Sequence, residues 1–180
     1  MRHRDLAVVL VLAALLAAAP GVLRADGAAP AGGAALAESI GPVTGLALPR
    51  FVSLGTDRGN LRRGPSLTHK VDWVYVRPGI PLRVTAEFGN WRRVRDGDGV
   101  GGWIHAALLS GRRSAIVRVP MAALHRRPDA DAPLTARLEK GVVGRLTACR
   151  PAWCRFDAGH YAGWMPKSAL WGVTDGEVWN

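Results

Sequence analysis

Two cysteines, Cys149 and Cys154, have the most definite chemistry of any residues in this 180-residue chain. They enclose four residues in the segment CRPAWC, a spacing that suits a cross-strand pair closing a four-residue hairpin loop. Facing Cα atoms in such a pair lie about 4.5–5.5 Å apart, which is within reach of a disulfide bond. Because an oxidising compartment would form that bond, we predict a disulfide between the two residues.

A metal site or a catalytic thiol would be another use of the same cysteines. A metal site would need more ligands than the two cysteines and His160, and a catalytic thiol would need an orienting base. The sequence has no GxSxG, HExxH or glycine-rich phosphate-loop motif, and Asp96-x-Asp98-Gly99 lacks the later ligands of a calcium loop. We therefore predict no metal, no cofactor and no enzymatic activity.

Aromatic and arginine residues are the candidates for ligand binding. The chain has seven Trp, and a groove for an extended peptide or sugar needs flat apolar faces with a polar rim. Our candidate ligand-binding residues are Trp73, Tyr75, Trp91 and Arg93. Core packing is the alternative for each tryptophan, and it is the expectation for the two that follow glycine at a strand start, Trp103 and Trp164.

The basic charge is concentrated in one part of the chain. The net charge is +10, and residues 50–113 hold twelve Lys or Arg against five acidic residues, whereas residues 114–180 hold nine against six. Such a field attracts anionic partners, although solubility is an alternative explanation. Because the N-terminus predicts export, nucleic acid is not an expected partner.

The first residues are typical of an export signal. Arg2, His3 and Arg4 form a basic region, and Leu6 to Ala19 form an apolar stretch that is too short for a comfortable membrane span. We predict a signal peptide over residues 1–19, with the cleavage point open between 19 and 37, and a periplasmic or secreted protein without an integral membrane span. An uncleaved N-terminal anchor is the alternative. Residues 20–49 are mostly Ala, Gly and Pro, which predicts a disordered linker.

One sequence pattern occurs twice after the linker. The segment from Gly79, GIPLRVTAEFGNWRRVRDGDGVGGWIHAALLSG, aligns with GVVGRLTACRPAWCRFDAGHYAGWMPKSALWG from Gly141. Equivalent residues include Val84 and Leu146, Trp91 and Trp153, Val94 and Phe156, Trp103 and Trp164, and Leu109 and Leu170. Internal repeats of this kind indicate repeated structural units, so we predict two domains, residues 50–113 and 114–180.

Each unit has the pattern of short strands. Apolar residues alternate in runs such as Leu82, Val84 and Ala86, and turn residues such as Gly89-Asn90 separate the runs. The pattern predicts an all-β fold of two tandem small, partly open barrels. Cys149 and Cys154 align with Glu87 and Arg92 of the first unit. Glu87 and Arg92 could therefore form an opposite-charge cross-strand pair that stabilises the equivalent hairpin, as the disulfide does in the second unit.

These motifs resemble the bacterial SH3-like domain family, in its exported alphaproteobacterial form. The resemblance rests on LRRGPS (61–66), GNWRRV (89–94) and GGWIHAALLSG (101–111), and on ACRPAWCRF (148–156) and AGWMPKSAL (162–170) in the second unit. It implies five- or six-stranded barrels that bind wall or partner components beside a peptidoglycan hydrolase. The aromatic residue that helps eukaryotic relatives bind proline-rich helices is replaced here by Ala107-Leu108 and Ala169-Leu170, so such peptides are not the expected ligand.

The sequence therefore predicts an exported, non-catalytic binding module. Its expected partner is a cell-envelope component, either peptidoglycan or a peptide of an envelope protein. The alternative is a protein–protein interaction scaffold that docks on a partner envelope enzyme.

Overall fold

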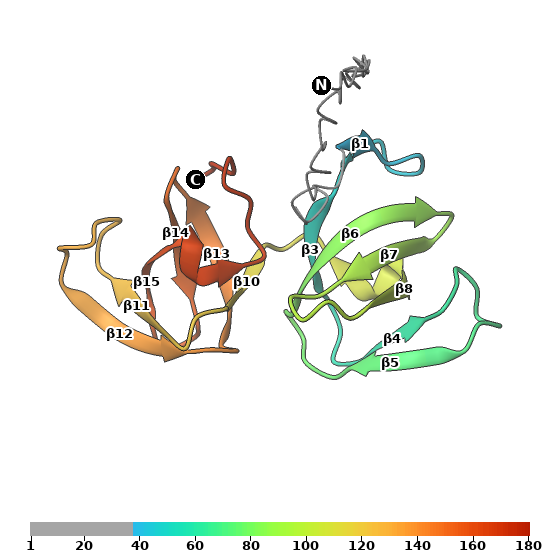
Figure 1. The fold of residues 1–180 in the computed structure, drawn as a ribbon, viewed down its shortest axis with the longest axis horizontal. Coiled ribbons are helices and arrows are strands. Elements are labelled where there is room, and N and C mark those ends of the chain that lie inside the picture. Colours follow the sequence, from blue (N-terminus) through green and yellow to red (C-terminus); the bar gives the residue numbers. More distant parts are fainter. Residues whose placement is uncertain (1–37) are drawn as a thin grey trace, which may run out of the picture. The chain divides into compact units, whose positions relative to one another are not determined.

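The computed structural model describes residues 38–180, which form an all-β structure. They contain two seven-stranded antiparallel sheets and one two-stranded sheet (Figure 1). The prediction of two tandem, partly open β-barrels is confirmed. The predicted signal peptide and residues 20–37 of the predicted linker lie outside the described residues. Within residues 38–180, no helix has the length and apolar character needed to cross a membrane.

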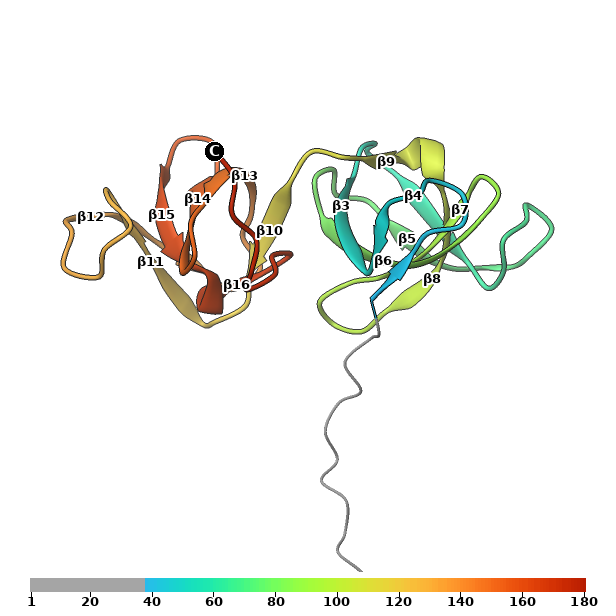
Figure 2. The same ribbon diagram turned by 90° about the horizontal axis from the view of Figure 1, so that it is seen from above.

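The first barrel is a sheet with the strand order β5-β4-β8-β7-β6-β3-β9. Its elements in chain order are β3 (Arg50–Leu54), β4 (Gly59–Arg62), β5 (Val71–Tyr75), β6 (Pro81–Phe88), β7 (Trp91–Arg95), β8 (Gly101–His105), the 3₁₀ helix η1 (Ala106–Leu108) and β9 (Leu109–Ser110). Figure 2 shows these strands curling around a shared interior. The predicted turns at Gly89-Asn90 and at Asp96 connect β6 to β7 and β7 to β8.

The second barrel repeats the same order with β12-β11-β15-β14-β13-β10-β16. Its elements in chain order are β10 (Ser114–Val117), β11 (Met121–His125), β12 (Leu134–Glu139), β13 (Val143–Cys149), β14 (Trp153–Asp157), β15 (Ala162–Pro166), the 3₁₀ helix η2 (Lys167–Ala169) and β16 (Leu170–Trp171). Gly79 and Gly141, which align in sequence, both have positive φ angles, 77° and 88°, in the turn before the longest strand of their barrel. This left-handed conformation is readily adopted by glycine and explains why the repeat has glycine there twice.

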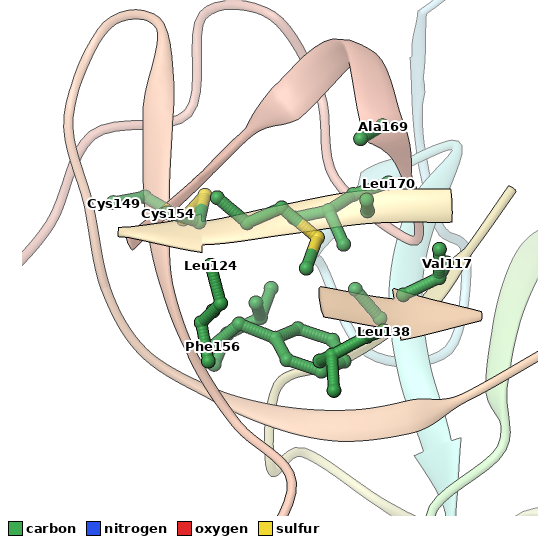
Figure 3. Packing of buried hydrophobic residues seen from close by; sticks show 12 residues of the cluster. Val117, Leu124, Leu138, Cys149, Cys154, Phe156, Ala169 and Leu170 are labelled. Atoms are coloured by element: carbon green, nitrogen blue, oxygen red, sulfur yellow. A yellow bond between two sulfur atoms is a disulfide. The ribbon is translucent and has the colours of Figure 1, made fainter. Parts of the chain in front are cut away.

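Each barrel has its own apolar core, built from the alternating residues of its strands. Figure 3 shows the core of the second barrel around Phe156. In the first barrel the equivalent positions hold Leu82 and Val94, whereas the second has Gly144 and Phe156. A Cβ atom on Gly144 would lie 2.4 Å from Cε1 of Phe156. The two barrels thus fill similar interior space with different pairs of large and small residues, as close packing requires.

The predicted disulfide is confirmed. Cys149 and Cys154 are bonded, their Cα atoms lie 4.1 Å apart, and the two residues face each other across the β13–β14 hairpin. Both are fully buried in the second core (Figure 3). The backbone of Cys149 also exchanges two hydrogen bonds with Trp179, which pairs the C-terminal tail, residues 173–180, with the end of β13.

The prediction of a disordered linker needs correction for its last residues. Residues 39–48 form an N-terminal hairpin in which β1 (Ser39–Ile40) pairs with β2 (Ala47–Leu48). Its turn is held by the carboxylate of Glu87, which accepts hydrogen bonds from the backbone amides of Val43 and Thr44 and from the Thr44 hydroxyl. The composition of the segment did not indicate order because the residue that holds it is more than 40 positions away.

Candidate ligand-binding face of the first barrel

Strand β7 presents alternate residues to the interior and to solvent. Arg92 and Val94 are buried, whereas Arg93 and Arg95 are exposed and Trp91 is half-buried. Because residues two apart on a strand share a face, Trp91, Arg93 and Arg95 lie on the outer face of the sheet. Two of the predicted ligand-binding residues, Trp91 and Arg93, are therefore brought together on one surface.

A surface groove of about 460 Å³ lies at the Trp91 end of this face. It is lined by two loops and the end of β8, and its residues are Pro65, Ser66, Leu67, Phe88, Gly89, Asn90, Trp91 and His105. Leu67 and Phe88 are 74% and 62% exposed. The indole of Trp91, which also lines the groove, packs edge-on against the imidazole of His105, with ring centroids 5.3 Å apart and planes at 86°.

Arg62 shapes the loop that forms one wall of the groove. It is the last residue of β4, and its Nη1 donates hydrogen bonds to the carbonyl oxygens of Leu67, at 3.0 Å, and His69, at 2.7 Å. The loop is closed further by a hydrogen bond from the Arg63 amide to the Lys70 carbonyl. Charge-assisted hydrogen bonds of this kind are stronger than neutral ones, so Arg62 holds Leu67 in position at the groove.

A buried ion-pair network supports the opposite wall. Arg92 donates from Nη1 to the carbonyl oxygens of Gly89 and Trp91, each at 2.8 Å, and thus braces the turn beneath the groove. Its Nε lies 3.5 Å from Glu87, whose side chain is fully buried and also accepts a hydrogen bond from Arg50 at 2.7 Å. Burial alone would raise the pKa of Glu87, but the hydrogen bonds from Thr44, Arg50 and Val43 outweigh it and lower the pKa to about 2. Glu87 is therefore ionised and positions the groove rather than binding a ligand.

Beyond the groove, the outer face carries arginines next to an aromatic ring. Arg93 lies opposite Trp103 of β8, and Trp103 lies opposite Arg62 of β4. One row further along, Arg95 lies opposite Arg83 of β6. None of the ion pairs within residues 38–180 includes Arg83, Arg93 or Arg95. The face therefore passes from an apolar groove to a band of uncompensated positive charge.

The other two predicted ligand-binding residues lie elsewhere in the first barrel. Trp73 is 48% exposed on β5, pairs with Leu61, and is not among the residues that line the groove. Tyr75 is only 5% exposed, and its hydroxyl donates a hydrogen bond to Asp96 at 3.0 Å. Burial and the neighbouring Asp96 carboxylate raise the pKa of Tyr75, which keeps the phenol protonated. Tyr75 therefore fixes the β7–β8 turn from inside the barrel.

Several groove residues were missed by the sequence reasoning. Leu67 is an exposed apolar residue in a loop, and Phe88 is an exposed apolar residue at the end of β6. His105 is a single histidine at the end of β8, where its Nδ1 accepts a hydrogen bond from the Ala107 amide. The LRRGP motif (61–65) was the available signal, because Pro65 lines the groove and Arg62 holds the loop that carries Leu67. The periodicity of the strands carries no information on which two loops face each other.

These observations define a class of protein, namely two small β-barrels in tandem, the first with a groove suited to an extended ligand. Two regions of the chain, residues 55–111 and 118–172, match the family model described as the bacterial SH3 domain. The chain belongs to the bacterial SH3 domain family. Members of this family are in general non-catalytic binding modules, and they typically bind cell-wall components.

Solved structures with a similar chain path include three proteins of low sequence identity. They are NlpC2 and NlpC1 from Trichomonas vaginalis, each 15% identical with a TM-score of 0.31 over 68% of this chain, and an NlpC/P60 family protein from Bacillus cereus ATCC 10987, 12% identical with a TM-score of 0.31 over 67%. The alignments cover 48%, 45% and 55% of those chains, so this chain spans about half their length. Among curated proteins, no match is found.

Proposed function

We propose that this chain is an exported, non-catalytic binding module that engages peptidoglycan or a peptide of an envelope protein through the first barrel. The observation that carries the proposal is the groove of about 460 Å³ in which exposed apolar side chains flank the Trp91–His105 pair. An exposed apolar groove on a small soluble domain is typical of a ligand site. The family's usual binding of cell-wall components supports the choice of partner.

The shape of the groove favours an extended ligand. Leu67 lies on the loop after β4 and Phe88 lies at the end of β6. The Trp91–His105 ring pair offers a flat aromatic edge against which a sugar ring or a peptide side chain packs. The charged band of Arg93 and Arg95 continues along the outer face from Trp91. A ligand longer than the groove would therefore meet positive charge as it leaves it.

The test is retention of the protein, without its predicted signal peptide, on isolated cell-wall sacculi at low and high salt. Trp91→Ala removes the groove wall, and Trp153→Ala, at the equivalent position of the second barrel, is the matched control. We expect Trp91→Ala to weaken retention at least about tenfold, since truncating a central aromatic residue of a binding site costs about 2 kcal/mol or more. The Trp153→Ala variant should bind as the wild type does. Equal retention of both variants, or no retention of the wild type, would reject the proposal for peptidoglycan.

An interaction scaffold is the second candidate function. The N-terminal hairpin exposes three apolar side chains, with Ile40, Val43 and Leu46 at 69%, 48% and 54% exposure. Exposed apolar groups gathered on one element are typical of protein–protein contacts. If the wild type fails to bind sacculi but captures an envelope enzyme, and if replacing these three residues with serine abolishes that capture, the scaffold is the function.

A further inference from the structure

Arg83 and Arg95 face each other directly on adjacent strands of the first barrel. They are Cα partners in the β6–β7 ladder, so their side chains leave the same face of the sheet. Two like charges in this arrangement destabilise the sheet. The Nε of Arg83 is also buried and has no hydrogen-bond partner within the described residues, which adds the cost of an unsatisfied donor.

The second barrel places complementary charges at the same two positions. Arg145 and Asp157, which align with Arg83 and Arg95, are also Cα partners, and Nη2 of Arg145 lies 3.5 Å from Oδ2 of Asp157. The same ladder position is therefore compatible with an ion pair. The cationic pair of the first barrel is a feature of that barrel and is not required by the fold.

We propose that Arg83 and Arg95 form a subsite for an oxyanion, the carboxylate or phosphate group of the ligand that the first barrel binds. Guanidinium groups match the planar, two-oxygen edge of such anions, and a bound anion would offset the like-charge repulsion between the two arginines. Arg93 lies two residues from Arg95 on the same face, about 7 Å away along the strand. It adds a third positive charge beside the subsite.

This inference deepens the proposed function and rests on it for the identity of the ligand, but the subsite is testable with simple anions. The arginine Nε–H signals of the whole protein would be followed by NMR during titration with inorganic phosphate and, separately, with succinate. Ionic strength is held constant with chloride. We expect the Arg83 and Arg95 signals to shift and saturate, while the Arg145 signal does not. Saturation with phosphate alone or with succinate alone would identify which oxyanion the subsite accepts.

Two substitutions separate binding from folding. Arg95→Asp copies the second barrel, so it should keep or slightly raise the thermal stability while weakening anion binding about tenfold or more. Asp157→Arg copies the first barrel and should create a second saturable site that includes Arg145. Anion binding that survives in Arg95→Asp, or the absence of saturable shifts in the wild type, would overturn the inference.

The outcome for the subsite is independent of the outcome for the groove. Retention on sacculi that depends on Trp91 but is unaffected by Arg95→Asp, with no phosphate or succinate binding, would reject the subsite and leave the proposed function intact. Saturable anion binding without any retention on sacculi would retain the subsite and reject peptidoglycan as the partner.

Discussion

The two barrels secure the same hairpin by different chemistry. In the first barrel, Glu87 and Arg92 face each other at the end of β6 and β7, and the carboxylate also holds the N-terminal hairpin. In the second barrel, the equivalent residues Cys149 and Cys154 are joined by a disulfide, and the C-terminal tail pairs with Cys149. The cross-strand position therefore accepts either a buried ion pair or a covalent bond.

In each barrel a terminal segment also covers a strand edge that would otherwise be open. The pairing of β3 with β6 stops at Val84, and the pairing of β10 with β13 stops at Arg145, so the last residues of each long strand have no barrel strand on that side. Uncovered strand edges are prone to pair with other chains. The N-terminal hairpin approaches this part of β6 and the tail approaches that of β13 (Figure 1). The N-terminal hairpin and the C-terminal tail thus cover equivalent strand edges in the two barrels.

The tail of the second barrel is held by charged side chains as well as by its strand pairing. The buried Lys167 donates from Nζ to the carbonyl oxygens of Asp175 and Glu177, and Arg113 forms a bidentate pair with the Glu177 carboxylate. Trp179 completes the arrangement with a hydrogen bond from its indole nitrogen to Glu177. In the disulfide-bonded second barrel, several hydrogen bonds and an ion pair therefore hold the C-terminal tail. In the first barrel, the N-terminal hairpin depends on Glu87.

The largest effect on stability is expected from removing the carboxylate of Glu87. Glu87→Ala leaves Arg50 and Arg92 without their shared partner and releases the turn of the N-terminal hairpin, so the first barrel should lose about 3–5 kcal/mol of stability. Chemical denaturation followed by NMR, with separate probes in each barrel, measures the loss. Asp72→Ala, which removes an exposed pair with Arg63, is the control and should cost far less stability, because exposed ion pairs are screened by solvent. An equal loss in the two variants would contradict the role given to Glu87.

A smaller effect is expected from removing the disulfide. The double substitution Cys149→Ala and Cys154→Ala opens a short loop, for which the entropy lost on closure corresponds to about 2 kcal/mol. The second barrel should lose this stability, while the first barrel should unfold at an unchanged denaturant concentration. Reduction of the wild-type protein should reproduce the result. A matching loss in the first barrel would mean that the two barrels unfold as one unit.

The fold could be predicted from the sequence because the patterns that indicate it are local and occur twice. Alternating apolar residues, turn glycines and the spacing of Cys149 and Cys154 each act over a few residues, and the two copies supported one another. The order of the N-terminal hairpin did not follow, because it depends on the contact of Val43 and Thr44 with Glu87. Long-range contacts of this kind leave no trace in local composition.

The candidate binding face could be predicted only in part, for a similar reason. All four candidates were chosen by residue type. Trp91 and Arg93 share the outer face of β7, whereas Tyr75 lies in the core. Leu67, Phe88 and His105 come from three separate elements that meet only in the folded barrel. Alternation within a strand identifies a face, whereas a groove between loops requires knowledge of which loops are neighbours.

A further expected effect separates the two barrels by pH. The pKa of Glu87 lies at about 2 in the folded protein, below its ordinary value of 4.5, so its contribution to stability is complete above about pH 4.5 and declines as the pH falls from there toward 2. The disulfide of the second barrel carries no such proton linkage. Amide hydrogen exchange should therefore show protection at the β6–β7 hairpin falling more steeply with acidification than protection at the β13–β14 hairpin. Glu87→Gln removes the titrating group while keeping an oxygen acceptor for the hairpin, so it should abolish most of this difference. If the difference in protection persists in Glu87→Gln, the acid sensitivity of the first barrel comes from another group. The contrast between an ion pair in the first barrel and a disulfide in the second would then not explain it.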